Sequence, residues 1–428
     1  MNNKNEAERQ WYRLDNAAKL YPAVRNSRWS ANFRVSVTLK KEIDPLYLQQ
    51  AVNATMHRLT NFRLKLHRGL FWYYLEEDPY PNLVQPDVNN PCRPFSGREK
   101  RGQLFRVRYY HKRIAVEFFH VLTDGTGAMV FLKTLTAEYL RRKEGVEIPC
   151  EEGVVDLNGK ADPEEMEDSF PKYAKFRTLK SRKENKAYHF AGTLLPLGSI
   201  HIVTGTLPLD QALAKAKGFG VSLTEFLVSV MIFSIAQCQK NSRAKIELPV
   251  KVSVPVNLRQ YYPSKTLRNF ALYVNPGIEP RYGEFTLEEI TEEVHHFMRM
   301  NLKEKYLNAV MCKNLSSESN PVLRMIPLFV KNVAMSLAFR KYGDSLISST
   351  LSNLGAVKVP KVMEAYIEHF DFMLGRFLTS FPNATVVSYQ NALRFTWTSG
   401  MVEKDVERLF FTTLVRMGLP VRVESNLR

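Results

Sequence analysis

A strand pattern followed by an aspartate, a proline and a helix pattern occurs twice in this chain, which narrows the possible folds. Residues 32–39 (NFRVSVTL) alternate apolar and polar side chains, as a half-buried strand does. Asp44 and Pro45 then suit the N-cap and first position of a helix through residues 46–59. Residues 199–207 repeat the strand pattern, and Pro208-Leu209-Asp210 leads into the helical QALAKAK. The repeat indicates two α/β halves of similar build.

Further elements follow from local patterns. Residues 106–110 and 114–119 predict a hairpin, and apolar spacing after Gly127 predicts a helix. Thr224 is the expected N-cap of a helix through residues 226–236. Residues 321–339 predict one helix, and a final helix near residues 402–417 is expected to stop at Gly418.

The length of the chain, 428 residues, suits two or three hydrophobic cores. Residues 151–194 are acidic and then basic, with little apolar periodicity. We therefore expect an N-terminal half at residues 1–150, a crossover or linker at 151–195 and a C-terminal half at 196–428.

The net charge is +17, which favours anionic partners such as nucleic acid, membranes or phosphorylated small molecules. The densest basic runs lie in residues 98–113 and 177–186, but neither has zinc-ligand spacing or a ribonucleoprotein motif. We therefore expect a solvated basic surface and no nucleic acid.

The four cysteines are far apart and form no pair typical of a metal site or a disulfide framework. No metal is expected. The first residues are polar, and the most apolar stretch, residues 226–238, is shorter than the roughly 18 residues of a membrane span. The expected location is therefore the cytoplasm, with no transmembrane segment.

The stretch from His120 to Gly125 (HVLTDG) is the strongest candidate site, because it joins an apolar strand to a glycine-led helix. A neutral imidazole at such a junction can accept a proton from an alcohol or an amine. A hydrogen-bonded core histidine is the competing interpretation. Asp124 either orients the imidazole or fixes the loop by pairing with an arginine, and Gly125 and Gly127 favour the second role. No G-x-S-x-G elbow occurs, which favours direct attack over an acyl-enzyme.

These residues resemble the HHxxxDG or HxxxDG motif of the chloramphenicol-acetyltransferase-like superfamily, which includes condensation domains, wax-ester synthases and alcohol acetyltransferases. Three other stretches are similar to its motifs: residues 58–63 (RLTNFR), residues 254–259 (VPVNLR) followed by 268–270 (RNF), and residues 352–355 (SNLG). The resemblance covers roughly residues 10–425, and bacterial alcohol-acetyltransferase-like proteins look closest. Phe119 stands where doubled motifs have their first histidine, and the DFGWG motif of plant enzymes is absent.

The resemblance implies two chloramphenicol-acetyltransferase-like α/β sandwich domains meeting at a central active-site tunnel. His120 would deprotonate the acceptor, while Asp124 would be structural and pair with Arg63. Gly125, Arg63 and Arg259 would support the site. Ser352 and Asn353 would lie across the tunnel, where a side-chain donor could stabilise the oxyanion.

The leading hypothesis is an O-acyltransferase that moves an acetyl or longer acyl group from acyl-CoA to an alcohol, with no bound cofactor. The expected partners are acyl-CoA and a small alcohol or amine acceptor. One alternative is a stand-alone condensation-type domain that takes its acyl group from a carrier protein. The other is a non-catalytic binding module of the same fold. Acceptor identity, acyl chain length and oligomeric state do not follow from these motifs.

Overall fold

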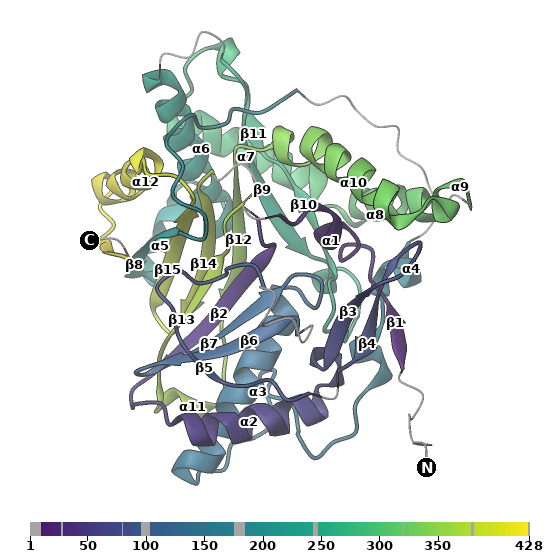
Figure 1. Cartoon of the computed structure of the whole chain (residues 1–428). Helices are drawn as coiled ribbons and strands as arrows, with labels where there is room; N and C mark the ends of the chain where they lie inside the picture. Colours follow the sequence, from purple (N-terminus) through teal and green to yellow (C-terminus); the bar gives the residue numbers. More distant parts are fainter. Residues whose placement is uncertain are drawn as a thin grey trace, which may run out of the picture.

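The computed structural model describes residues 10–26, 29–78, 80–95, 103–174, 185–242, 247–319, 321–377 and 381–426. Residues 98–102 of the first basic run and residues 177–184 of the second lie outside these ranges. The chain forms a mixed α/β structure with two sheet-rich lobes, each with its own hydrophobic core (Figure 1). Among the described residues, no single helix is long and apolar enough to cross a bilayer. Helices α5 (Leu209–Gly218) and α6 (Leu223–Asn241) reach the necessary length and hydropathy only when taken together, and the chain bends by 79° between them.

The N-terminal lobe is built on a five-stranded sheet of order β13-β2-β7-β6-β5. Its strands are β2 (Asn32–Leu39), β5 (Gln85–Pro86), β6 (Phe105–Tyr110), β7 (Arg113–Phe119) and β13 (Ile367–Leu374). Helix α3 (Gly125–Glu144) packs against β2 and β7, and α2 (Pro45–Arg58) packs on α3. Asp44 caps α2 by accepting a hydrogen bond from the Leu46 amide, as its sequence predicts.

The C-terminal lobe is built on an eight-stranded sheet of order β10-β9-β12-β14-β15-β8-β16, with β11 also paired to β9. Its strands are β8 (His201–Pro208), β9 (Val250–Asn257), β10 (Ala271–Val274), β11 (Gly277–Ile278), β12 (Ser349–Ala356), β14 (Asn383–Tyr389), β15 (Ala392–Ser399) and β16 (Arg422–Ser425). The other helices of this lobe include α7 (Leu287–Asn301) and α12 (Asp405–Arg416), which pack on α6.

Strand β13 ties the two lobes together. It belongs to the second half of the chain, yet it pairs antiparallel with β2 from Leu39 to Phe33. Directly after β13, the Gly375 amide donates to the Asn32 carbonyl. A Cβ atom on Gly375 would lie only 2.7 Å from that carbonyl oxygen, so a side chain there would collide with the backbone of β2. The N-terminal sheet is therefore complete only when the C-terminal half supplies its edge.

The remaining elements lie around these two sheets. A small sheet of order β1-β4-β3 contains β1 (Trp11–Arg13), β3 (Leu64–Arg68) and β4 (Tyr73–Glu77). The remaining helices are α1 (Leu20–Val24), α4 (Ser169–Tyr173), α8 (Glu304–Ser319), α9 (Pro321–Met325), α10 (Leu328–Tyr342) and α11 (Lys361–Glu364). Helix α10 packs against α1.

One expectation about a helix end was wrong, and another helical segment is interrupted. Ser222, not Thr224, caps α6, because Ser222 and Glu225 exchange the two hydrogen bonds of a capping box. Residues 321–339 are helical as expected, but they form two helices, α9 and α10. Pro327 separates them, because proline disfavours a helical conformation at the residue before it.

Candidate active site

His120 follows the last residue of β7 and lies in an aromatic environment. Its ring stacks on Tyr21 of α1 with 4.5 Å between ring centroids, and Phe33 of β2 lies 5.0 Å away on the same measure. The His120 amide donates to the carbonyl of Ala31, which fixes the backbone where the strand ends. Burial lowers the pKa of the His120 imidazole from its ordinary value of 6.5, so the ring is neutral at pH 7.

The hydrogen bonds of Asn269 determine which ring nitrogen of His120 carries the proton. The Asn269 amide nitrogen donates to the Asp15 carboxylate at 3.1 Å and to the His120 carbonyl at 3.0 Å. The amide oxygen therefore faces His120 Nδ1, 2.9 Å away, and a flipped amide would place oxygen against two acceptors. Because this oxygen can only accept, Nδ1 carries the hydrogen and Nε2 carries a lone pair.

Asp15 anchors the far end of this chain of hydrogen bonds. Its side chain is fully buried and accepts from the Ala18 amide at 2.7 Å, and the guanidinium of Arg268 lies 3.6 Å away. Asn269 is also buried, at 2% exposure. The series Asp15–Asn269–His120 thus joins the N-terminal segment, the loop before β10 and the end of β7.

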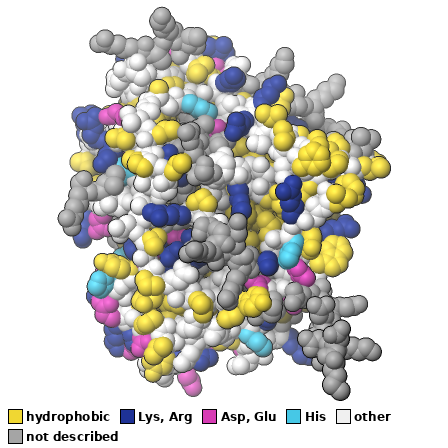
Figure 2. Space-filling model, in the orientation of Figure 1, with side chains coloured by type: hydrophobic (Ala, Val, Ile, Leu, Met, Phe, Trp, Pro, Cys, Tyr) yellow, Lys and Arg dark blue, Asp and Glu magenta, His cyan; other side chains and the backbone are white. Residues whose placement is uncertain are grey.

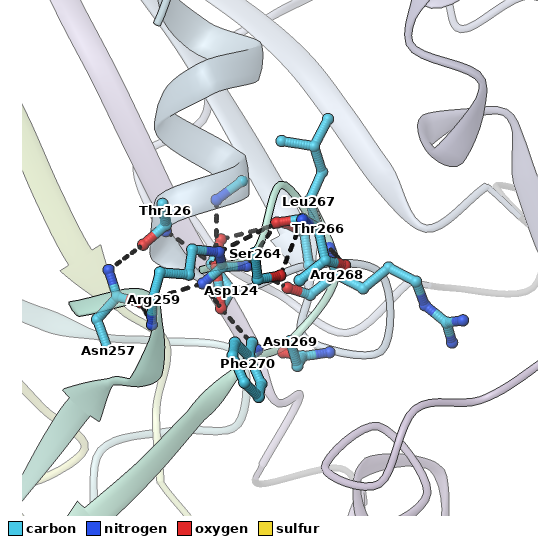
Figure 3. Close-up of polar contacts among 12 residues, drawn as sticks. Asp124, Thr126, Asn257, Arg259, Ser264, Thr266, Leu267, Arg268, Asn269 and Phe270 are labelled. Carbon is cyan, nitrogen blue, oxygen red and sulfur yellow. Dashed lines mark hydrogen bonds and ion pairs between the residues drawn. The ribbon is translucent and has the colours of Figure 1, made fainter. Parts of the chain in front are cut away.

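Asp124 accepts four hydrogen bonds, none of them from the His120 ring. One carboxylate oxygen accepts from the amides of Thr126 and Gly127, which caps α3. The other accepts from the Arg259 guanidinium at 2.7 Å and from the Phe270 amide at 2.9 Å (Figure 3). Asp124 therefore fixes the loop and joins it to the C-terminal lobe.

The partner of Asp124 is Arg259, and the expected pairing with Arg63 was wrong. Arg63 lies at the end of a short 3-10 helix before β3, where its carbonyl accepts from the Asp78 amide. Arg259 follows β9, and the hydrogen bond from its amide to the Asn257 side chain shapes this turn. The tertiary fold thus brings the arginine of the 254–259 stretch, and not Arg63 of the 58–63 stretch, to the aspartate.

Residues 266–270 form a loop that both lobes hold in place. Arg259 donates to the carbonyls of Thr266 and Arg268, and the Thr123 hydroxyl donates to the Leu267 carbonyl at 2.6 Å (Figure 3). A Cβ atom on Gly127 would lie 2.3 Å from the Leu267 carbonyl oxygen, so only glycine allows this approach. This loop carries Asn269 to His120.

Gly125 and the 352–355 stretch meet at the start of α3. A Cβ atom on Gly125 would lie 2.5 Å from Leu354 Cδ2, so the end of β12 packs against this helix start. The Asn353 amide nitrogen donates to the Thr224 hydroxyl at 2.9 Å, and its oxygen accepts from the Gly355 amide at 2.7 Å. Asn353 is therefore engaged in shaping the end of β12 and in joining it to α6. Ser352 is half-buried on β12.

The sequence patterns did not reveal every residue at this site. Asp15 and Tyr21 carried no local signal, because each reaches His120 only through the tertiary fold. Asn269 had one signal, its place in the RNF stretch, although a turn residue was the simpler interpretation. Within the described ranges, no group of three or more His, Cys, Asp or Glu side chains is placed to hold a metal ion.

Comparisons with known proteins find similarity in structure only. No family model and no curated protein matches the sequence. Trichothecene 15-O-acetyltransferase from Fusarium sporotrichioides superposes with a TM-score of 0.61 at 10% identity, covering 97% of this chain and 96% of that one. The first condensation domain of the calcium-dependent antibiotic synthetase gives 0.61 at 14% identity, covering 95% and 96%. The starter condensation domain of rhizomide synthetase, in complex with C8-CoA and Leu-SNAC, gives 0.60 at 12% identity, covering 95% and 94%.

Proposed function

We propose that this chain, whose fold is that of the chloramphenicol-acetyltransferase-like and condensation-domain superfamily, is an O-acyltransferase that uses acyl-CoA. The acceptor is a small alcohol, and His120 is the general base. One observation carries the proposal: burial keeps His120 neutral, and the Asn269 amide held by Asp15 fixes its proton on Nδ1 and leaves a lone pair on Nε2. The lone pair on Nε2 is the feature that a general base requires.

In this mechanism the acceptor hydroxyl attacks the thioester carbonyl while His120 Nε2 takes its proton. The new C–O bond gives a tetrahedral intermediate, which collapses as the C–S bond breaks. The imidazolium then returns the proton to the thiolate of CoA, so no covalent enzyme intermediate forms. The Asn269 oxygen accepts from Nδ1–H throughout, and the charge of Asp15 favours the transient imidazolium.

The other motif residues have separate roles in the proposal. Tyr21 covers a face of the imidazole, which leaves the Nε2 edge for the acceptor. Asp124 and Arg259 hold the loop that carries Asn269, so they act by positioning and transfer no proton. Ser352 is the candidate donor to the oxyanion, because both ends of the Asn353 amide are already engaged.

The choice of CoA as donor rests on two observations. A structure of similar fold, the starter condensation domain of rhizomide synthetase, binds C8-CoA. The chain itself carries a net charge of +17, which favours the phosphates of CoA. A donor attached to a carrier protein is the alternative, and it uses the same base and the same thioester chemistry.

The test measures free thiol released from acetyl-CoA and octanoyl-CoA in the presence of a panel of primary alcohols and amines. We expect His120→Gln to lower the rate by about 10²–10⁴. The control is His296→Gln, which changes an exposed histidine on α7. Equal rates for wild type and His120→Gln would remove His120 as the base. Transfer only from an acylated carrier protein would replace CoA as the donor.

A further inference from the structure

Helix α10 presents an apolar side to solvent, together with α9 and the turn between β3 and β4. The exposed side chains that form this surface, called here the α10 surface, are Leu70, Met325, Phe329, Val330, Val333 and Leu337. Phe329, Val333 and Leu337 recur at helical spacing, and each is more than 60% exposed. Figure 2 shows hydrophobic side chains gathered where α8–α10 lie in Figure 1.

The α10 surface is held in place by contacts from beneath. The Leu328 amide donates to the Leu70 carbonyl at 2.8 Å. The buried Lys331 ammonium lies 3.6 Å from the centre of the Trp72 ring and donates to the Phe71 carbonyl at 3.1 Å. The turn and the helix therefore form one continuous face.

The inner side of α10 already has its packing partners. Phe339 stacks on Trp29 with 4.9 Å between ring centroids, and α10 packs against α1. Core packing thus accounts for one side of the helix only. Apolar side chains on the opposite side cost solubility and add nothing to the core, so they indicate an interaction surface.

The charges around this surface have one sign. Residues 319–343 contain Arg324, Lys331, Arg340 and Lys341 but no aspartate or glutamate. Arg340 and Lys341 are exposed at the C-terminal end of α10, and Arg324 is exposed on α9. The exposed positions of α10 are apolar apart from Arg340, Lys341 and the hydroxyl of Tyr342, so the charges that this helix exposes beside its apolar part are cations.

We propose that the α10 surface docks on an anionic lipid bilayer. An amphipathic surface with aromatic and aliphatic side chains and bordering cations inserts among the headgroups and acyl chains, while its cations meet the negative lipids. A second copy of this chain fits less well, because a symmetric contact would bring the same cations together without an acid to pair them. Docking does not depend on acyl transfer, so either proposal can fail alone.

The experiment is co-sedimentation of the full chain with vesicles of phosphatidylglycerol and phosphatidylcholine, compared with vesicles of phosphatidylcholine alone. We expect binding to the anionic vesicles, and a loss of binding as salt rises from about 0.01 M to about 1 M. The double variant Phe329→Ser/Leu337→Ser should weaken binding about tenfold or more. Arg340→Gln/Lys341→Gln should weaken binding to anionic vesicles and leave any binding to neutral ones unchanged.

The control variant is Leu213→Ser, an exposed leucine on α5, which should bind as wild type does. Thermal unfolding reports whether each variant folds, and it should match wild type because all five changed residues are exposed. Failure to bind anionic vesicles, or equal binding by wild type and the serine double variant, overturns the proposal. The proposal is also overturned if sedimentation velocity shows that wild type is a dimer and the serine double variant is a monomer, because the α10 surface would then join two copies.

Discussion

Replacing Asp124 by asparagine isolates the link between the two lobes from the cap of α3. Asparagine caps a helix as well as aspartate does, so the bonds from the Thr126 and Gly127 amides can remain. The second oxygen becomes an NH₂ group, which faces the Arg259 guanidinium and the Phe270 amide, both donors. The change therefore turns two hydrogen bonds into donor–donor contacts at a buried position.

The expected cost follows from the burial of the pair. The Arg259 and Asp124 side chains are 11% and 8% exposed, and removing one partner of a buried ion pair costs about 3–5 kcal/mol. Arg259 keeps its bonds to the carbonyls of Thr266 and Arg268, which places the expected loss near the lower end, about 3 kcal/mol. Asp44→Ala is the matched comparison, because it removes only the cap of α2 and should cost about 1 kcal/mol.

Urea unfolding followed by circular dichroism measures both losses in free energy of unfolding. The double variant Asp124→Asn/Arg259→Gln should lose about 1 kcal/mol less than the sum of the two single losses, since both changes remove the same ion pair. An Asp124→Asn protein that unfolds like wild type but has lost thiol release would refute the argument, because Asp124 would then act in the chemistry.

Two other changes probe the relay and a buried acid. Asn269→Ala should lower kcat for thiol release about tenfold or more, because the tautomer of His120 is no longer fixed. The variant also loses a hydrogen bond that favours the imidazolium, so the pKa of His120 should fall and the acidic limb of the kcat/KM profile should move to lower pH. An unchanged pH profile would contradict the relay. Burial on α12 raises the pKa of Glu407 from 4.5 to about 7, so the folded state binds the extra proton and wild-type stability falls as pH rises through this interval. The variant Glu407→Gln does not lose stability in this way. In urea titrations, the difference in free energy of unfolding between the variant and wild type should therefore shift by about 3 kcal/mol in favour of the variant from pH 4.5 to pH 8. A difference that stays constant with pH would show that Glu407 ionises freely.

Local patterns in the sequence predicted the mixed α/β fold and most of its elements. The strand at residues 32–39 and the cap at Asp44 appear as expected, because alternation and capping depend on neighbours in the chain. The junction at His120 was also readable, since a strand, a histidine and a glycine-led helix follow one another directly. The assignment of His120 as a base stays a prediction until activity is measured.

The contacts that give His120 its chemistry were decided by the tertiary structure alone. Asp15 and Asn269 are 254 residues apart, and Arg259 lies 135 residues from Asp124. No periodicity or spacing encodes such a pairing, because it depends on how β13 closes the N-terminal sheet and how the 266–270 loop is held. The sequence determined which residues could do the chemistry. The fold decided that Arg259, and not Arg63, meets Asp124, and that an amide backed by a buried carboxylate sets the tautomer of His120.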